Sequence, residues 1–108
     1  MCGFSGIIND EDFNQHEIKS INELLNHRGP DSTNYFQSKV DKFNIYLGHK
    51  RLSIIDLSEQ ANQPMKFEEL AILYNGEIYN FKNIRSKLEK IGYIFQTKSD
   101  TEVVLKAF

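Results

Sequence analysis

The chain lacks the features that mark secreted, membrane and nucleic-acid-binding proteins. It has one cysteine, too few for an internal disulfide, and it has neither an Asn-x-Ser/Thr acceptor nor a basic leader followed by an apolar stretch. No apolar run approaches the roughly 18 residues needed to cross a bilayer. A formal net charge of -2 offers no basic surface for nucleic acid. These absences favour a cytoplasmic protein with no membrane or nucleic-acid partner.

Metal-binding patterns are absent as well. The three histidines, His16, His27 and His49, are scattered, and no Cys/His cluster has the spacing of metal ligands. We therefore expect no metal site. The remaining composition, 40% hydrophobic and 26% charged over 108 residues, is typical of a soluble globular protein of one domain or less.

The single cysteine, Cys2, follows Met1 directly. Removing Met1 would place a thiol, with a free pKa of about 8.5, and an α-amine, with a pKa of roughly 7.7 to 8.0, on one residue. Such a residue can supply both a nucleophile and a proton acceptor. The alternative is that Cys2 is a small buried apolar residue, as most lone cysteines are.

Alternating apolar and polar residues predict several strands. They lie at 4–8, 43–47, 51–55 and 70–74, with a short one at 94–97. Asn75-Gly76 has β-like residues on both sides, which is typical of a two-residue hairpin turn.

Three segments have the apolar spacing of helices, at 18–25, 81–91 and 99–108. Asn14 with Glu17, and Ser99 with Glu102, form capping-box patterns at the start of the first and the third. The third is still running at the end of the sequence, so the elements that would cover its apolar side chains are missing. We therefore expect a fragment of a larger domain, with marginal stability or self-association.

Four further segments carry polar residues in turns or at element ends: Arg28-Gly29-Pro30-Asp31, the strand edge around Arg51, Asn75-Gly76-Glu77 and Ser99-Asp100-Thr101-Glu102. Each has an architectural explanation. Arg51 is typical of a solvated surface charge, and Asp31 of a turn-capping group. Their order and combination with Cys2 favour a functional site instead.

The motifs along the chain closely resemble one family. They are Met1-Cys2-Gly3, His27-Arg28-Gly29-Pro30-Asp31, Arg51-Leu52-Ser53-Ile54-Ile55-Asp56, Gln63-Pro64-Met65, Asn75-Gly76-Glu77-Ile78-Tyr79-Asn80 and Ser99-Asp100-Thr101-Glu102. Together they resemble the glutaminase domain of glutamine-hydrolysing asparagine synthetases, which are class II amidotransferases with an N-terminal cysteine. Sister amidotransferases that make glucosamine phosphate or the first purine amine do not typically carry this combination.

The resemblance implies an α+β architecture, the N-terminal nucleophile hydrolase fold, a four-layer α/β/β/α sandwich of antiparallel sheets. Residues 1–108 would be the N-terminal portion of the glutaminase domain, with the synthetase domain absent. Because strands would then be missing, we expect glutamine hydrolysis by this chain alone to be weak or absent.

The resemblance also implies roles for individual residues. The Cys2 thiol would attack the side-chain amide carbon of L-glutamine and release ammonia, leaving a thioester that water cleaves to glutamate. The oxyanion would be stabilised by the Asn75 side-chain amide and the Gly76 N–H. Arg28 and Asp31 would shape the turn beside the site without taking part in the chemistry.

The same resemblance implies a substrate pocket around Cys2. Arg51 would bind the α-carboxylate of glutamine, because a guanidinium offers fork geometry. Asp100, with Glu77 nearby, would bind the α-ammonium group. The remaining pocket residues would be Leu52, Ile54, Ile55, Asn75 and Gly76.

Several partners and alternatives follow. The glutaminase step would need no cofactor, whereas ATP and Mg would enter only through the absent synthetase domain, which uses the ammonia to amidate aspartate. Related domains amidate sugars or peptidyl carboxylates, so the acceptor stays open. Two alternative functions also stay open. One is a non-catalytic fragment that binds glutamine or pairs with a companion chain, and the other is an unrelated small α/β module. The oligomeric state stays open as well, a homodimer included.

Overall fold

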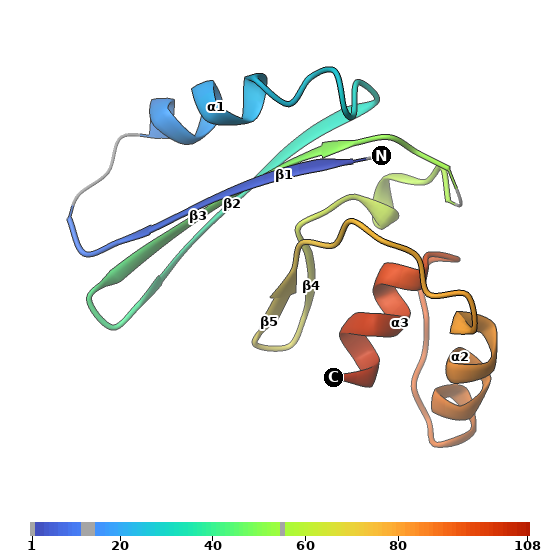
Figure 1. Cartoon of the computed structure of the whole chain (residues 1–108). Helices are drawn as coiled ribbons and strands as arrows, with labels where there is room; N and C mark the ends of the chain where they lie inside the picture. The colour runs from blue at the N-terminus through green and yellow to red at the C-terminus, as the bar shows by residue number, and fades with distance from the viewer. Residues whose placement is uncertain (1, 12–14, 55) are drawn as a thin grey trace.

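The computed structural model describes residues 2–11, 15–54 and 56–108, and it has the expected α+β class with antiparallel sheets (Figure 1). The elements are β1 (Gly3–Asn9), α1 (Gln15–Glu23), β2 (Ser32–Val40), β3 (Phe43–Arg51), a short 3₁₀ helix (Glu59–Ala61), β4 (Met65–Phe67), β5 (Leu70–Ile72), α2 (Phe81–Lys90) and α3 (Asp100–Ala107). In this described part, no helix has the length and apolar character needed to span a membrane.

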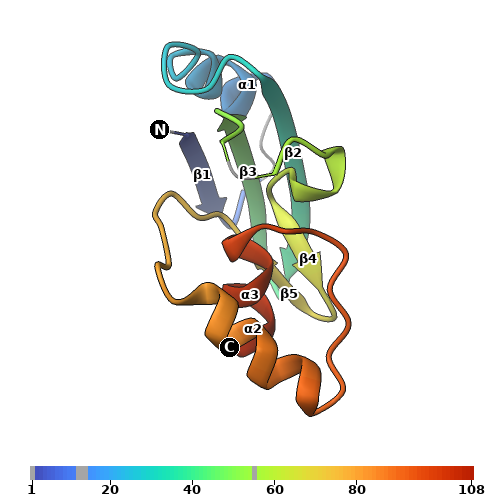
Figure 2. The same ribbon diagram turned by 90° about the vertical axis from the view of Figure 1, so that its right-hand side faces the viewer.

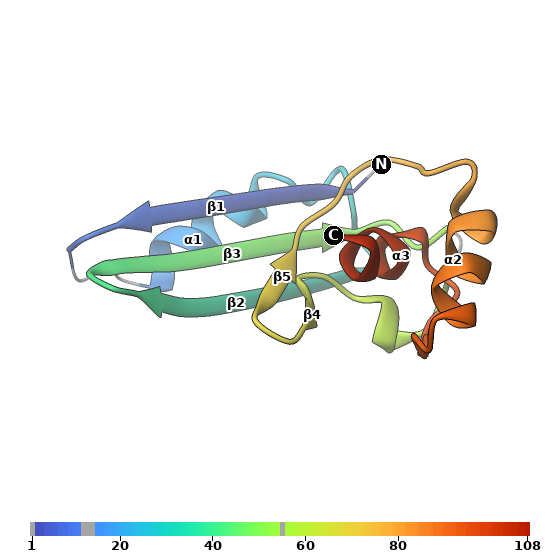
Figure 3. The same ribbon diagram turned by 90° about the horizontal axis from the view of Figure 1, so that it is seen from below.

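The larger sheet has three antiparallel strands in the order β1-β3-β2 (Figure 3). Gly3 pairs with Lys50 on one side of β3, and Ser32 pairs with Arg51 on the other. A tight turn joins β2 to β3 through Asp41, whose φ of 53° is left-handed. This register brings the start of β1, the start of β2 and the end of β3 to one end of the sheet.

The elements form layers. Helix α1 covers one face of the three-stranded sheet, and the β4–β5 hairpin followed by α3 and α2 lies on the other side (Figures 1 and 2). This order of helix, sheet, sheet and helix is compatible with the N-terminal nucleophile hydrolase fold. Viewed from below, the hairpin lies against one end of the sheet, α3 lies at that end and α2 lies beyond it (Figure 3).

The interior of the described part is largely polar. Six hydrophobic side chains are buried, from Ile18, Tyr46, Ala61, Met65, Val103 and Leu105, against eleven polar or charged ones. The radius of gyration is 14.9 Å, whereas about 13 Å is usual for a compact domain of this length. The apolar layer that normally holds such elements together is therefore thin here.

Two strand predictions and the hairpin prediction are wrong. Only Arg51 of the segment 51–55 is in a strand, and Ile55 lies outside the described residues. Segment 94–97 forms no strand, because its N–H groups at Gln96 and Thr97 bind the Glu102 carboxylate instead. Asn75-Gly76 joins no strands, since β5 ends at Ile72, and the observed hairpin turns at 68–69, before β5.

The helix predictions are mostly confirmed. Helix α2 ends just before Gly92, which has a φ of +103°, and α3 begins after Ser99, whose hydroxyl accepts from the Thr101 N–H at 3.1 Å. Glu102 does not complete the capping box, because its carboxylate binds the preceding loop. Helix α1 ends at Glu23, earlier than expected, and Asn14 of its capping box lies outside the described residues.

Candidate active site

A cavity of about 360 Å³ lies at the end of the sheet where β1 starts and β3 ends. It collects eight of the residues predicted for the site: Cys2, Arg51, Leu52, Ile54, Asn75, Gly76, Glu77 and Asp100. The ninth, Ile55, is outside the described residues. The lining also includes seven residues that were not predicted: Asp56, Ala61, Gln63, Tyr74, Tyr79, Ser99 and Thr101.

Cys2 is half-buried and is held at two points by other segments. Its Sγ lies 3.3 Å from the Leu52 N–H, which donates to it, and 3.5 Å from the Leu52 carbonyl, to which the thiol donates. Its own carbonyl accepts from Arg28 Nε at 3.3 Å. The thiol is thereby fixed beside the end of β3, directly after Arg51.

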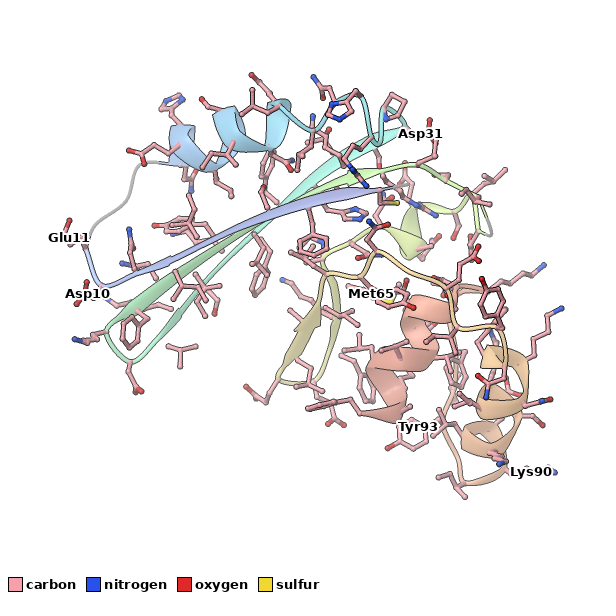
Figure 4. The ribbon with its side chains drawn as sticks, in the orientation of Figure 1. Asp10, Glu11, Asp31, Met65, Lys90 and Tyr93 are labelled. Atoms are coloured by element: carbon pink, nitrogen blue, oxygen red, sulfur yellow. The ribbon has the colours of Figure 1, made fainter. Side chains whose placement is uncertain are left out.

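The turn at 28–31 packs against the backbone of β3. A Cβ added at Gly29 would lie 2.3 Å from the Lys50 carbonyl oxygen, so only glycine allows this approach. Asp31 donates its N–H to the Arg51 carbonyl at 3.0 Å, and its carboxylate accepts from the Ser53 N–H at 2.7 Å. Asp31 is labelled at this end of the sheet in Figure 4, whereas Asp10 and Glu11 lie at the opposite end.

Arg51 is 8% exposed, so the alternative of a solvated surface charge is wrong. Its Nη1 donates to the Ser58 carbonyl at 2.8 Å and to Asn62 Oδ1 at 2.7 Å, and its Nη2 donates to the Asp56 carbonyl. A guanidinium has five N–H donors. Within the described part, Nε–H and one N–H of Nη2 therefore have no protein acceptor, and two such donors can bind a carboxylate.

Asp56 anchors the loop that receives Arg51. Its carboxylate accepts from the Ser58 N–H and from the Lys98 N–H, at 2.8 and 2.7 Å. Hydrogen bonds from the Ser58 side chain and from these backbone groups lower the pKa of Asp56 to about 2. The loop is thus tied to the segment that leads into α3.

His49 lies two residues before Arg51 on β3 and is fully buried. Burial, and next the positive charge of Arg51, lower the pKa of His49 to about 4. Neither ring nitrogen has a hydrogen-bond partner among the described residues. At neutral pH the imidazole is therefore uncharged, and it does not repel a ligand cation or compete with Arg51 for an anion.

The first turn of α3 supplies a buried carboxylate. Asp100 is 5% exposed, and its Oδ2 accepts from the Ile78 N–H at 3.0 Å. Its Oδ1 has no partner in the described part.

The pKa of Tyr74 reflects the charges that surround the cavity. Burial raises the pKa of its hydroxyl, and so do the negative charges of Asp100 and Glu77. Its ring lies over Gly76, where an added Cβ would be 2.8 Å from the Tyr74 hydroxyl oxygen. The side of the cavity formed by Tyr74, Asp100 and Glu77 is therefore negative, whereas the side formed by Arg51 is positive.

Glu102 holds the segment before α3 in place. Its carboxylate accepts from the N–H groups of Gln96 and Thr97 and from the Thr97 hydroxyl, and it pairs with Lys106 at 2.8 Å. Although burial opposes the charged form, these hydrogen bonds lower the pKa of Glu102. The ion pair and the hydrogen bonds fix the loop that carries Ser99 and Asp100.

Comparisons with known proteins agree with the geometry. Residues 1–108 match the family model of the glutamine amidotransferase domain. The chain is 44% identical over 115 residues to asparagine synthetase [glutamine-hydrolyzing] 1 of Bacillus subtilis (strain 168), covering all of this chain and 17% of that protein. It is 37% identical over 125 residues to the putative asparagine synthetase [glutamine-hydrolyzing] 2 of Methanocaldococcus jannaschii, covering 24% of it. It is also 33% identical over 122 residues to Amidase chry2 of Gibberella zeae, covering 18% of it.

The chain thus spans between about a sixth and a quarter of the length of these relatives. Every part of it is matched in each of the three. The chain belongs to the glutamine amidotransferase domain family and is homologous to glutamine-hydrolysing asparagine synthetases.

Proposed function

We propose that this chain binds L-glutamine in the cavity beside Cys2 and hydrolyses its side-chain amide to glutamate and ammonia. The observation that carries the proposal is the convergence of three groups in one cavity. They are a thiol, a guanidinium with two N–H donors left over, and a buried carboxylate with a free oxygen. A free amino acid has the complementary anion and cation at its α-carbon.

The two charged sides of the cavity orient the substrate. The α-carboxylate accepts from Nε and Nη2 of Arg51, and the α-ammonium group donates to Asp100 Oδ1 with Glu77 nearby. These two contacts select a free amino acid, because a residue within a peptide has neither a free α-carboxylate nor a free α-ammonium group. The cavity volume of about 360 Å³ is at the small end of the range for ligand pockets and suits one amino acid.

The chemistry begins once Met1 has been removed. The α-amine of Cys2 accepts the thiol proton, and Sγ attacks the side-chain amide carbon of glutamine. The Asn75 amide and the Gly76 N–H stabilise the tetrahedral oxyanion. The C–N bond then breaks, the leaving nitrogen takes the proton and departs as ammonia, and a glutamyl thioester remains. Water cleaves this thioester, which releases glutamate and restores the thiol, and no cofactor takes part.

The names of the relatives suggest where the ammonia goes. Two of them are asparagine synthetases, so we propose that the whole protein delivers ammonia to an ATP- and Mg-dependent synthetase domain that amidates aspartate. The relative named as an amidase keeps a different acceptor open. On its own, the chain is expected to turn over slowly, because the β4–β5 hairpin and the helices α3 and α2 lie only at or beyond one end of the larger sheet (Figure 3).

Mass spectrometry tests the premise, since the intact mass must show that Met1 has been removed. The purified chain is then treated with a glutamine analogue that carries a chloroketone in place of the side-chain amide. We expect one adduct on Cys2, protection by free L-glutamine, and no adduct in Cys2→Ser. Slow glutamate release from glutamine should be lost in the same variant.

A charge change tests the substrate pocket. Asp100→Asn keeps the size of the side chain and should raise the glutamine concentration needed for half-protection at least tenfold. Asp10→Asn, at the far end of the sheet, is the matched control and should have no effect. A thermal shift with glutamine but no Cys2 adduct would instead indicate a chain that binds without catalysis, and retention of Met1 would contradict the proposed chemistry.

A further inference from the structure

Gln63 is a buried polar side chain that lines the cavity but has no part in the proposed chemistry. It is 7% exposed, and it lies just before β4 in the Gln63-Pro64-Met65 motif. A buried side-chain amide is retained only where its hydrogen bonds are satisfied. The partners of Gln63 therefore indicate what it does.

The amide of Gln63 binds both main-chain groups of a single residue. Its Oε1 accepts from the Tyr74 N–H at 2.5 Å, and its Nε2 donates to the Tyr74 carbonyl at 3.1 Å. A neighbouring strand would bind Tyr74 in the same way. Because β5 ends at Ile72, Tyr74 has no strand partner in the described part, and Gln63 takes that place.

A third hydrogen bond ties the same amide to α3. Nε2 donates to the Thr101 hydroxyl at 3.3 Å, in a buried contact next to Asp100. Gln63 thus joins the segment before β4, the segment after β5 and the first turn of α3. Since the contact is buried, it fixes Tyr74 relative to α3 more rigidly than an exposed one would.

The residues that follow Tyr74 depend on this contact. Asn75 and Gly76 are exposed, and neither has a hydrogen bond within the described part of the chain. Their position relative to Cys2 is therefore set from two ends, by the main chain of Tyr74 before them and by the hydrogen bond from the Ile78 N–H to Asp100 after them. Gln63 holds the first of these ends, whereas the Ile78 N–H and the Ser99 cap still hold Asp100 when the Gln63 amide is lost.

We propose that Gln63 is a positioning residue, which sets the main chain of Tyr74 and so places the Asn75 amide and the Gly76 N–H for the oxyanion. This inference rests on the proposed function. It predicts a specific kinetic signature: loss of the Gln63 amide lowers the rate of Cys2 acylation and leaves glutamine binding nearly intact. A residue needed only for folding would lower both together.

Two substitutions separate the donor from the acceptor. Gln63→Glu can still accept from the Tyr74 N–H but cannot donate to the Tyr74 carbonyl or to the Thr101 hydroxyl, whereas Gln63→Met loses all three hydrogen bonds. Gln60→Glu is the matched control, because it makes the same charge change three residues earlier at an exposed position of the 3₁₀ helix.

The readouts are the saturating rate of Cys2 acylation by the glutamine chloroketone, the affinity for L-glutamine from protection, and amide hydrogen exchange. We expect the acylation rate to fall at least about tenfold in both Gln63 variants, because small displacements of oxyanion donors have large effects on rate. The affinity for L-glutamine should change by less than about threefold, because the contacts of the substrate with Arg51 and Asp100 stay intact. Gln60→Glu should match the wild type in both.

Hydrogen exchange checks the fold and the contact itself. The amides of the central strand β3 should keep their protection in every variant, while the Tyr74 N–H should lose protection in Gln63→Met. An unchanged acylation rate in Gln63→Glu and Gln63→Met, or an equal fall of rate and affinity, would overturn the inference. A wild-type chain that does not react with the chloroketone would overturn the proposed function and this inference with it, whereas reaction that is insensitive to Gln63 removes this inference alone.

Discussion

The two ends of β3 have opposite surroundings. At its start, Phe43 is 43% exposed and its β2 partner Val40 is 54% exposed, while Ile8, which pairs with Ile45 two residues later, is 67% exposed. At its end, His49 and Arg51 are 0% and 8% exposed. Within one strand, the apolar end is therefore open to solvent and the charged end is buried. Along β3, burial therefore follows the candidate site and not side-chain hydrophobicity.

This difference has a physical basis. The buried end is held by hydrogen bonds between side chains and the main chain of other segments, as Arg51, Asp31 and Asp56 show. Such contacts are directional and fail when a donor, an acceptor or a close approach is changed. In the described residues, polar contacts at the open end are exposed ones, such as the Lys42–Asp10 ion pair at 3.3 Å and the hydrogen bond from the Asn44 amide to the Glu11 carbonyl. The following substitutions and pH changes should therefore act strongly at one end and weakly at the other.

The largest effect is expected for Gly29→Ala. The new Cβ would meet the Lys50 carbonyl oxygen at 2.3 Å and the Arg51 carbonyl carbon at 2.7 Å, and main-chain atoms cannot move aside. We expect the free energy of unfolding to fall by at least about 3 kcal/mol in urea titrations. Gly6→Ala is the control, because its Cβ would lie 3.2 Å from the flexible end of Leu47 and 3.7 Å from the Tyr46 carbonyl oxygen, an ordinary contact distance. Equal effects of the two substitutions would refute the close-packing explanation.

Mild acid should destabilise the buried end through His49. Its pKa is about 4 in the folded chain and 6.5 in the unfolded chain, so the unfolded state binds the proton more tightly. The contribution of the uncharged His49 to the free energy of unfolding is complete above pH 6.5. It is lost as the pH falls towards 4, and the total loss is about 3 kcal/mol or less. Urea titrations between pH 7 and 4 measure this slope. His49→Gln should remove it, whereas the exposed His27→Gln should leave it unchanged.

A smaller loss is expected for Glu102→Gln. The substitution removes the ion pair with Lys106 at 2.8 Å and one of the two oxygens that bind the loop at 96–97. Since the pair is almost fully buried, the free energy of unfolding should fall by about 2 kcal/mol. Glu89→Gln breaks an exposed pair of the same spacing, with Arg85, and should cost less than about 0.5 kcal/mol. Similar losses for both would mean that burial is not the deciding factor.

The smallest effect is expected at the open end. Ile8→Thr exchanges an exposed apolar side chain for a polar one on a strand, and unfolding free energy should change by less than about 0.5 kcal/mol. Ile18→Thr, at a position of α1 that is 3% exposed, should cost about 2 kcal/mol. A large loss from Ile8→Thr would show that another surface covers this end in solution.

Sequence patterns predicted the elements whose periodicity is regular. The strands β1 and β3 and the helices α2 and α3 were recognised because their apolar residues repeat at the spacing of a strand or a helix. Strand β2 was missed because Ser32–Val40 is mostly polar, and β4 because it has only three residues. The hairpin expected at Asn75-Gly76 failed because Gln63, eleven residues before Tyr74, takes the place of a strand.

The candidate site was predicted from motifs and not from spacing. Eight of the nine predicted site residues share the cavity, but nothing in the pattern shows that Arg51 is buried or that Glu102 binds the preceding loop. Both depend on contacts between distant segments, which a single sequence does not reveal. Tyr74 was missed for the same reason, since its place over Gly76 follows from how the chain folds back after β5.

The double attachment of Cys2 has a practical consequence for preparing this protein. The thiol binds Leu52 and the carbonyl accepts from Arg28, so residue 2 is fixed at the cavity. An affinity tag or a protease-cleavage scar joined to its nitrogen would remove the free α-amine that the proposed chemistry uses. Purification handles therefore belong after Phe108, whose side chain is 96% exposed.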